Sequence, residues 1–445
     1  MRQCMQNKVK LDHSHLYSEI RLNNFYTCLG KIDQIVGMTV EATGITCNIG
    51  DVCTITMDSS DKTVISEVVG FKEGKVLLMP YEDVDGIGYG SIVRNTGEKL
   101  MIKMSNELIG RTVNALGEPI DGKGEINGYE YYSINGVANN PMSRPPISEP
   151  IELGVKAIDG MLTMGKGQRM GIFAGSGVGK STLMGMIARN IKADVNVIAL
   201  VGERGREVLE FINRDLGEEG AARSVVVVAT SDQPAMLRSK CALTATTIAE
   251  YFRDQGKDVL LMMDSLTRYC MAQREIGLSV GEPPVVRGYT PSIYATLPKL
   301  LERSGNFEKG SITGIYTVLV EGDDSNEPIS DTVRGIIDGH IMLSRKVAMR
   351  NHYPAIDVLG SISRLMSQII DPEHKKATNE IRKIMSIYQE NQDLISIGAY
   401  KAGSNPDLDY AISKIDRINA FLQQPVDQGY NFNDTISLLK EIVND

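Results

Sequence analysis

The chain has 445 residues, 42% of them hydrophobic and 23% charged, with a formal net charge of −9. This is an ordinary globular composition for roughly two to four domains, and the acidic balance excludes a general attraction to nucleic acid or anionic lipid but not a local basic groove. No apolar run approaches the roughly 20 residues of a membrane-spanning helix, and the N-terminus lacks the apolar core of a secretory signal. The six cysteines form no CxxC pair. We therefore expect a reduced, cytoplasmic protein.

Residues 1–21 are polar and carry only a partial helical stripe of apolar side chains, at Val9, Leu16, Tyr17 and Ile20. Composition alone slightly favours a frayed tail. The alternative is a short amphipathic helix that binds a partner protein.

Residues 22–95 have a different character. Short β-branched runs alternate with glycines, a pattern that predicts a small β-barrel. Residues 96–154 are rich in turn signals and end in a proline-rich stretch, 139–154. Because proline disfavours helix in the residue before it, we expect this segment to be an extended connector into the next domain.

Residues 155–365 alternate strands and helices. The predicted strands are nearly continuous apolar runs, at 169–173, 195–201, 224–229, 258–264 and 313–320. Parallel strands covered by helices on both faces have this composition, so the sequence predicts a doubly wound α/β core. The pattern then becomes helical from residue 366 to residue 445, which indicates a C-terminal helical domain.

The stretch AGSGVGKST, residues 174–182, follows a predicted strand and opens a predicted helix. This is the setting of a P-loop, whose glycines let backbone N–H groups surround phosphate oxygens at the positive end of the helix. The first position, glycine in the strict pattern, is Ala174, a familiar variant. We expect Lys180 to reach the β- and γ-phosphates of ATP and the Ser181 hydroxyl to bind Mg²⁺. The predicted nucleotide-binding residues are Gly175, Ser176, Gly177, Val178, Gly179, Lys180, Ser181 and Thr182.

Two acidic residues end predicted strands of the same core. Asp264 closes the run 258–264, which has the form of a Walker B strand, so we expect it to orient the metal. Glu203 follows the run 195–201 and could polarise a water beside the γ-phosphate. Spacing alone gives equal weight to that role and to a simpler one, in which Glu203 and Glu207 complement a helix N-terminus.

These motifs together resemble the catalytic subunits of rotary ATPases and, more closely, the ATPases that energise flagellar and type III protein export. The resemblance rests on GERGREV (202–208), DSLTRY (264–269) and YPAIDVLGSISR (353–364), and on longer stretches at 223–284 and 310–324 that resemble the flagellar export ATPase. It implies a RecA-like P-loop core and Mg²⁺-dependent hydrolysis of ATP.

The resemblance also implies roles for single residues. Lys180 and Ser181 match phosphate and metal ligands, Asp264 matches the metal-orienting acid, and Glu203 matches the glutamate that activates the attacking water.

Further roles follow from the same resemblance. Arg204 and Arg268 match arginines that line the phosphate site, and Arg364 matches an arginine finger contributed across a subunit interface. Tyr353 matches an aromatic residue against the adenine, and Phe421 is a weaker candidate for that pocket.

The partners implied by the resemblance are those of an export machine. They are identical subunits in a hexameric ring, an export stator or regulator protein at the N-terminus, export gate and central-stalk proteins, and export chaperones with their cargo. The place implied is cytoplasmic, peripheral to the inner face of the cell membrane, and no nucleic acid is expected.

Three alternatives accompany this hypothesis. The first is a subunit of a rotary ATP synthase or vacuolar-type ATPase. The second is an RNA translocase of the transcription-termination type. Residues 1–95 lack the aromatic and basic face on which single strands stack, and this counts against that alternative. The third is a non-catalytic nucleotide-binding regulator, which the joint presence of Lys180, Glu203 and Asp264 disfavours.

Overall fold

The computed structural model describes residues 28–56, 63–128, 130–136, 140–320 and 327–444. The chain divides into two compact units, Met1–Lys99 and Leu100–Asp445, and each is considered by itself. The predicted N-terminal segment 1–21 lies outside the described residues. None of the described helices is long and apolar enough to cross a membrane.

The first unit is a closed β-barrel with strand order β1-β2-β5-β4-β3-β6 in the described residues. Alternate side chains point inward, as β3 illustrates: Cys53 and Ile55 are fully buried and line the barrel core. The predicted barrel is confirmed. Its strands are β1 (Leu29–Val36), β2 (Thr39–Thr43), β3 (Asp51–Thr56), β4 (Thr63–Lys72), β5 (Lys75–Pro80) and β6 (Ile92–Lys99).

The predicted connector has more regular structure than its sequence indicates. β7 (Met101–Met104) pairs with β9 (Glu130–Ser133), and β8 (Thr112–Asn114) adds a parallel strand to the edge of the central sheet. Strands of three or four residues are too short to give a recognisable alternation, so the turn signals around them dominate the sequence pattern. Two short 3-10 helices complete the segment, η1 (Asn106–Leu108) and η2 (Pro141–Ser143).

The second unit is built on a twisted central sheet with strand order β19-β18-β12-β17-β15-β13-β14-β8. Neighbouring strands on this path are parallel except β19, which runs antiparallel to β18. The predicted α/β class is confirmed. The strands are β12 (Arg169–Ala174), β13 (Val195–Glu203), β14 (Ser224–Thr230), β15 (Asp258–Asp264), β17 (Ser311–Leu319), β18 (Gly339–Leu343) and β19 (Ile356–Ser363), with small pairings by β10 (Pro150–Ile151), β11 (Met164–Gly165) and β16 (Gly305–Asn306).

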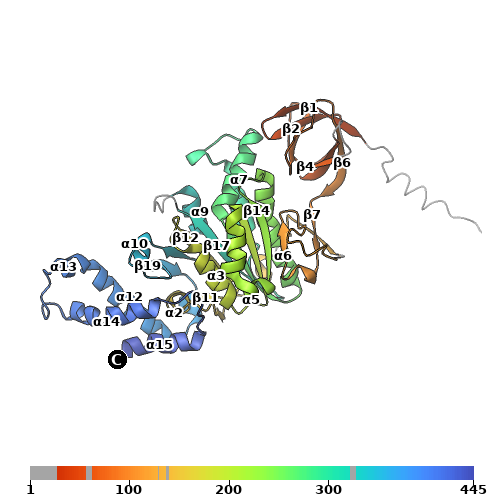
Figure 1. Cartoon of the computed structure of the whole chain (residues 1–445). Coiled ribbons are helices and arrows are strands. Elements are labelled where there is room, and N and C mark those ends of the chain that lie inside the picture. Colours follow the sequence, from red (N-terminus) through yellow and green to blue (C-terminus); the bar gives the residue numbers. More distant parts are fainter. Residues whose placement is uncertain (1–27, 57–62, 129, 137–139, 321–326, 445) are drawn as a thin grey trace, which may run out of the picture. The chain divides into compact units, whose positions relative to one another are not determined.

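Helices cover both faces of this sheet (Figure 1). Met262 belongs to the apolar core beneath α3 (Lys180–Asn190), whereas the next residue, Met263, belongs to the core beneath α6 (Ala235–Asp254) and α7 (Leu266–Ser279). Burial on both faces explains why the strands are apolar without alternation. The remaining helices of this domain are α2 (Lys156–Met161), α4 (Gly205–Glu210), η3 (Phe211–Leu216), α5 (Gly217–Ala222), η4 (Val286–Gly288), α8 (Pro291–Leu301), α9 (Pro328–Ile336), α10 (Arg345–Ala348) and α11 (Met366–Ile369).

The predicted C-terminal helical domain is confirmed, and it packs on α2. His374 Nε2 lies 2.7 Å from the carbonyl oxygen of Gly160, and Thr378 Oγ1 donates to the same oxygen at 3.1 Å. Gly160 permits this close packing, because a Cβ there would lie 2.9 Å from Cζ of Phe421. The helices are α12 (Pro372–Glu390), α13 (Gln392–Ser396), α14 (Pro406–Leu422) and α15 (Phe432–Asn444).

Candidate active site

The carboxyl ends of the parallel strands meet at one edge of the sheet. β12 ends at Ala174 before the glycine-rich loop, β15 ends at Asp264, and β13 continues to Glu203. Asp264 pairs in register with Leu200 of β13, so the two acidic residues are close across neighbouring strands. Open α/β sheets bind ligands at this edge.

The predicted P-loop has the backbone that its glycines allow. Gly177 and Gly179 have φ of +80° and +90°, values that other residues rarely adopt. α3 begins directly afterwards at Lys180, with the N–H of Leu183 donating to the Gly179 carbonyl at 3.0 Å. Ser181 and Thr182 therefore lie in the first helical turn, where N–H groups lack partners within the helix.

Lys180 joins the two acidic side chains. Its Nζ donates to Oδ1 of Asp264 and lies 3.7 Å from Oε1 of Glu203. Burial alone would lower the pKa of Lys180, but the negative charges of Asp264 and Glu203 outweigh burial and raise it. Burial, together with the charge of Asp264, raises the pKa of Glu203 to about 6. A carboxyl group that titrates near neutral pH suits proton transfer.

The two predicted phosphate-site arginines differ in placement. Arg268 lies in the first turn of α7 with its side chain against Gly202. Its positive charge partly opposes the rise in the pKa of Glu203 that burial and Asp264 cause. Its Nε is buried and has no hydrogen-bond partner among the described residues. Since buried donors nearly always have partners, this N–H fits an anionic ligand or a water. Arg204 is 66% exposed in its side chain and pairs with Glu207 at 3.0 Å, at the rim of the site.

A further residue contacts this cluster and was missing from the sequence-based candidates. Thr317, near the carboxyl end of β17, donates from Oγ1 to Oδ1 of Asp264 at 2.7 Å. The available signal was a threonine near the end of the mostly apolar run 313–320, which also contains the hydroxyls of Thr313 and Tyr316. Cross-strand register decides its partner, and register cannot be deduced from that run alone.

Tyr353 lies beside the P-loop. A Cβ on Gly179 would be 3.7 Å from two ring carbons of Tyr353, and the Tyr353 side chain is partly exposed. Phe421, the weaker adenine candidate, is buried instead against Gly160 and Lys156. That candidate was wrong, because Phe421 fills the interface between the core and the helical domain.

Arg364 lies away from this edge. The backbone N–H of Arg364 donates to the carbonyl oxygen of Asp338, and the backbone N–H of Asp338 donates to the carbonyl oxygen of Arg169 at the start of β12. The Nη2 of Arg364 donates to the carbonyl oxygen of Arg334 at 3.0 Å. The P-loop follows the opposite end of β12. Arg364 and the P-loop of the same chain are therefore separated by the length of that strand.

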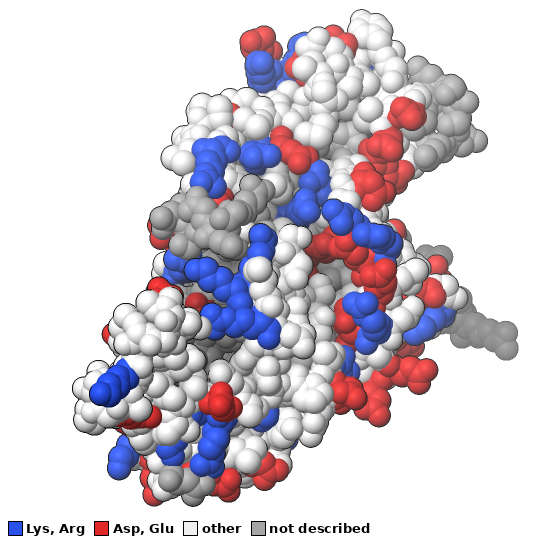
Figure 2. All heavy atoms as spheres, turned by 60° about the vertical axis from the view of Figure 1, so that its left-hand side comes forward, with Lys and Arg blue, Asp and Glu red and all other residues white. Residues whose placement is uncertain are grey.

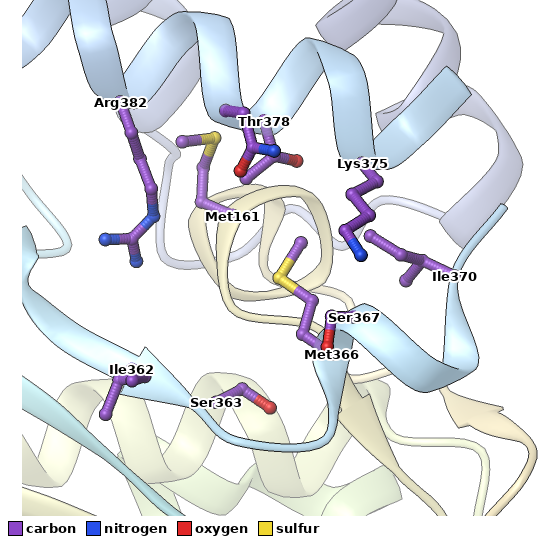
Figure 3. Close-up of a pocket in the computed structure, with 10 residues that line it drawn as sticks. Met161, Ile362, Ser363, Met366, Ser367, Ile370, Lys375, Thr378 and Arg382 are labelled. Carbon is purple, nitrogen blue, oxygen red and sulfur yellow. The ribbon is translucent and has the colours of Figure 1, made fainter. Parts of the chain in front are cut away.

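A cavity of about 240 Å³ lies between the core and the helical domain. Figure 3 shows Arg382 and Thr378 of α12 on one side of it and Ile362 and Ser363 of β19 on the other. No P-loop residue lines this cavity. It is therefore separate from the phosphate site and adjoins the strand that precedes Arg364.

The surface charge is unevenly distributed. The net charge is −9, yet Figure 2 shows lysine and arginine side chains gathered near the middle of one face, with acidic side chains grouped beside them. Local fields steer charged ligands and partners more than the total charge does. A net negative charge therefore does not exclude local clusters of basic side chains.

Family models match all three parts of the chain. The nucleotide-binding domain of the ATP synthase alpha/beta family matches residues 154–363, and the β-barrel domain of that family matches residues 32–97. The T3SS EscN ATPase C-terminal domain matches residues 370–441. This last match separates the chain from the rotary ATP synthase alternative, because its helical domain is of the secretion type.

Whole-chain relatives agree with these matches. The chain is 54% identical over 424 residues to the flagellum-specific ATP synthase of Bacillus subtilis (strain 168), covering 95% of this chain and 97% of the relative. It is 49% identical over 416 residues to the type 3 secretion system ATPase of Xanthomonas euvesicatoria, covering 94% of each.

Solved structures give the same result. The assembled ATPase EscN from the enteropathogenic E. coli type III secretion system has a TM-score of 0.89 and 46% identity, covering 93% of this chain and 100% of EscN. EscN in complex with its central stalk EscO has a TM-score of 0.86 and 45% identity over the same shares.

Proposed function

The chain belongs to the flagellum-specific and type III secretion ATPases of the ATP synthase alpha/beta family, and we propose that it hydrolyses Mg²⁺-bound ATP in a ring of identical subunits. The hydrolysis energises the export of flagellar, type III proteins by releasing them from chaperones and unfolding them. Six subunits are expected from the family resemblance.

The side chains at the sheet edge fit magnesium. This ion takes one or two oxygen ligands from protein together with phosphate oxygens and waters, and Ser181 and Asp264 supply a hydroxyl and a carboxylate. Among the described residues, no group of three or more His, Cys, Asp or Glu side chains is arranged to hold a metal ion. When bound, Mg²⁺ neutralises charge on the β- and γ-phosphate oxygens.

The remaining chemistry is assigned to the chain's own side chains. Lys180, which Asp264 and Glu203 neutralise in this structure, turns to the phosphates when ATP binds. Glu203 accepts a proton from the attacking water, and its raised pKa supports that role. Arg268 adds positive charge beside the reacting phosphate, with Arg204 at the rim.

The proposed ring rests on one observation: Arg364 lies at the amino ends of the parallel strands, whereas Lys180 of the same chain lies at their carboxyl ends. An arginine that stabilises the transition state must reach the γ-phosphate, so Arg364 can serve only the site of a neighbouring subunit. Contacts of this head-to-tail kind close into rings when the rotation between subunits allows. EscN, whose structure matches 93% of this chain, is described as assembled.

The direct test measures ATPase activity against protein concentration, with molecular mass measured in the same samples. Activity per subunit should rise cooperatively as rings form. Full activity in samples that contain only monomers would contradict the shared site.

The partners are proposed on similar grounds. EscN forms a complex with its central stalk EscO, and an equivalent stalk protein is expected here. Export gate proteins, chaperones and cargo, and a position peripheral to the inner face of the membrane follow from the same function. An export stator protein is expected to bind residues 1–21, and deleting them should abolish its capture while nucleotide binding persists. Unchanged capture would contradict this assignment.

A further inference from the structure

We propose that Thr317 is a positioning residue that fixes the carboxylate of Asp264 for its role toward Mg²⁺. Thr317 lies in β17 next to Asp264 in β15, because Tyr316 pairs with Met263 one residue earlier. Its Oγ1 donates to Oδ1 of Asp264 at 2.7 Å. The inference rests on the proposed Mg²⁺-dependent hydrolysis.

The packing of β17 alone does not explain why a hydroxyl side chain occupies position 317. Thr317 is fully buried, and Ile315, two residues before it on the same face, belongs to the apolar core beneath α3. A buried hydroxyl without a partner costs about 1–3 kcal/mol, whereas valine has nearly the same shape and would pack there without that penalty. The hydroxyl also lies 3.4 Å from the carbonyl oxygen of Met263, a much longer hydrogen bond than the one to Asp264. The contact with Asp264 therefore accounts for the hydroxyl.

The same oxygen of Asp264 is shared. Oδ1 accepts from Lys180 Nζ as well as from Thr317 Oγ1. When Lys180 turns to the phosphates, Oδ1 loses that donor and Thr317 remains. The terminal torsion of an aspartate has broad minima, so a carboxylate without donors could rotate away from the ion. Groups that orient metal-binding side chains in this way typically change metal affinity or activity by about 10- to 100-fold.

The chain offers a matched control. Thr313 lies four residues earlier on the same face of β17, is almost fully buried, and accepts from the Gly167 N–H at 2.9 Å, away from Asp264. Thr313→Val therefore removes a buried hydroxyl from the same strand without touching the metal-orienting acid. Comparing it with Thr317→Val separates a general loss of buried polarity from a specific loss at Asp264.

The experiment measures binding of fluorescent ADP across a series of Mg²⁺ concentrations, and ATPase rate across the same series. For Thr317→Val we expect unchanged ADP binding without Mg²⁺, and a Mg²⁺ concentration for half-maximal response raised by about 10-fold or more in both measurements. Thr317→Ser, which keeps the hydroxyl, should restore the wild-type response. Thr313→Val should respond to Mg²⁺ as wild type does.

The outcomes are distinguishable. A wild-type Mg²⁺ response in Thr317→Val protein would overturn the inference, provided that thermal melting shows this variant to be as well folded as Thr313→Val. If Thr317→Val does not fold, Thr317→Ala takes its place. A failure of Thr317→Ser to restore the response would also count against the hydroxyl. If wild-type protein hydrolyses no ATP, the proposed function fails, and the Mg²⁺ dependence of ADP binding still decides the role of Thr317.

Discussion

Arg364 and Lys180 lie at opposite ends of the strands of the same sheet. Backbone hydrogen bonds connect Arg364 through Asp338 to Arg169, the first residue of β12. Lys180 follows the glycine-rich loop that begins after Ala174, the last residue of β12. A strand of six residues at about 3.3 Å each separates the two edges by roughly 17–20 Å. The guanidinium of Arg364 donates to the carbonyl oxygen of Arg334 at 3.0 Å, at the end of the strands away from the P-loop.

This separation leads to a mixing prediction. Arg364→Ala should bind ATP but hydrolyse it about 10³-fold or more slowly, because arginine fingers contribute about 10³–10⁵ in rate. Lys180→Ala should be inactive through loss of its phosphate contact. In an equal mixture, roughly a quarter of interfaces join an intact site to an intact finger, so roughly a quarter of wild-type activity should return.

The control for mixing uses the double variant Lys180→Ala/Arg364→Ala. Mixed with Arg364→Ala, it provides no intact finger and should restore nothing. Equal recovery in both mixtures, or none in either despite confirmed subunit exchange, would contradict a finger that acts between subunits.

Glu203→Gln tests the proposed general base. Glutamine keeps the size of the side chain but cannot accept the proton, so the turnover rate should fall by about 10²- to 10⁴-fold while ATP affinity changes little. Glu207→Gln is the matched control, because Glu207 is partly exposed and pairs with Arg204. Steady-state kinetics and nucleotide titration of both variants decide. Equal rates for the two would assign Glu203 to a helix-capping role.

The sequence allowed much of this site to be predicted, because its parts are local. A P-loop and an acidic residue at a strand end are recognisable from a few neighbours, and parallel topology then brings Lys180, Glu203 and Asp264 to one edge. The contact of Thr317 depends on the register between β15 and β17, which no short pattern encodes. The place of Arg364 depends on β19 reversing direction against β18. Phe421 was misplaced because the family resemblance near the end of α14 does not specify how that helix packs, and in the structure Phe421 is buried against Gly160.

The pH dependence of the reaction should follow Glu203. Its pKa is raised to about 6 from 4.5 by burial and by the charge of Asp264. The proton must be absent for Glu203 to act as a base, so kcat/KM should be constant above about pH 7 and fall as the pH decreases through about 6. Measurement between pH 5 and 8 in buffers of constant ionic strength tests this. An inflection at the ordinary glutamate value would show that the free enzyme does not hold Glu203 in this environment.

Tyr353 provides a test of where the base of the nucleotide lies. Its ring is near Gly179 of the P-loop and partly exposed, so an adenine can stack on it. Stacking of a base on an aromatic side chain contributes about 1–3 kcal/mol, and Tyr353→Ala should therefore weaken ATP binding by roughly 5- to 150-fold. Tyr353→Phe should bind as wild type does. Inorganic tripolyphosphate, which has no base, is the control ligand: its affinity should be unaffected by either change, and an equal loss for both ligands would place Tyr353 in support of the P-loop instead of against the adenine.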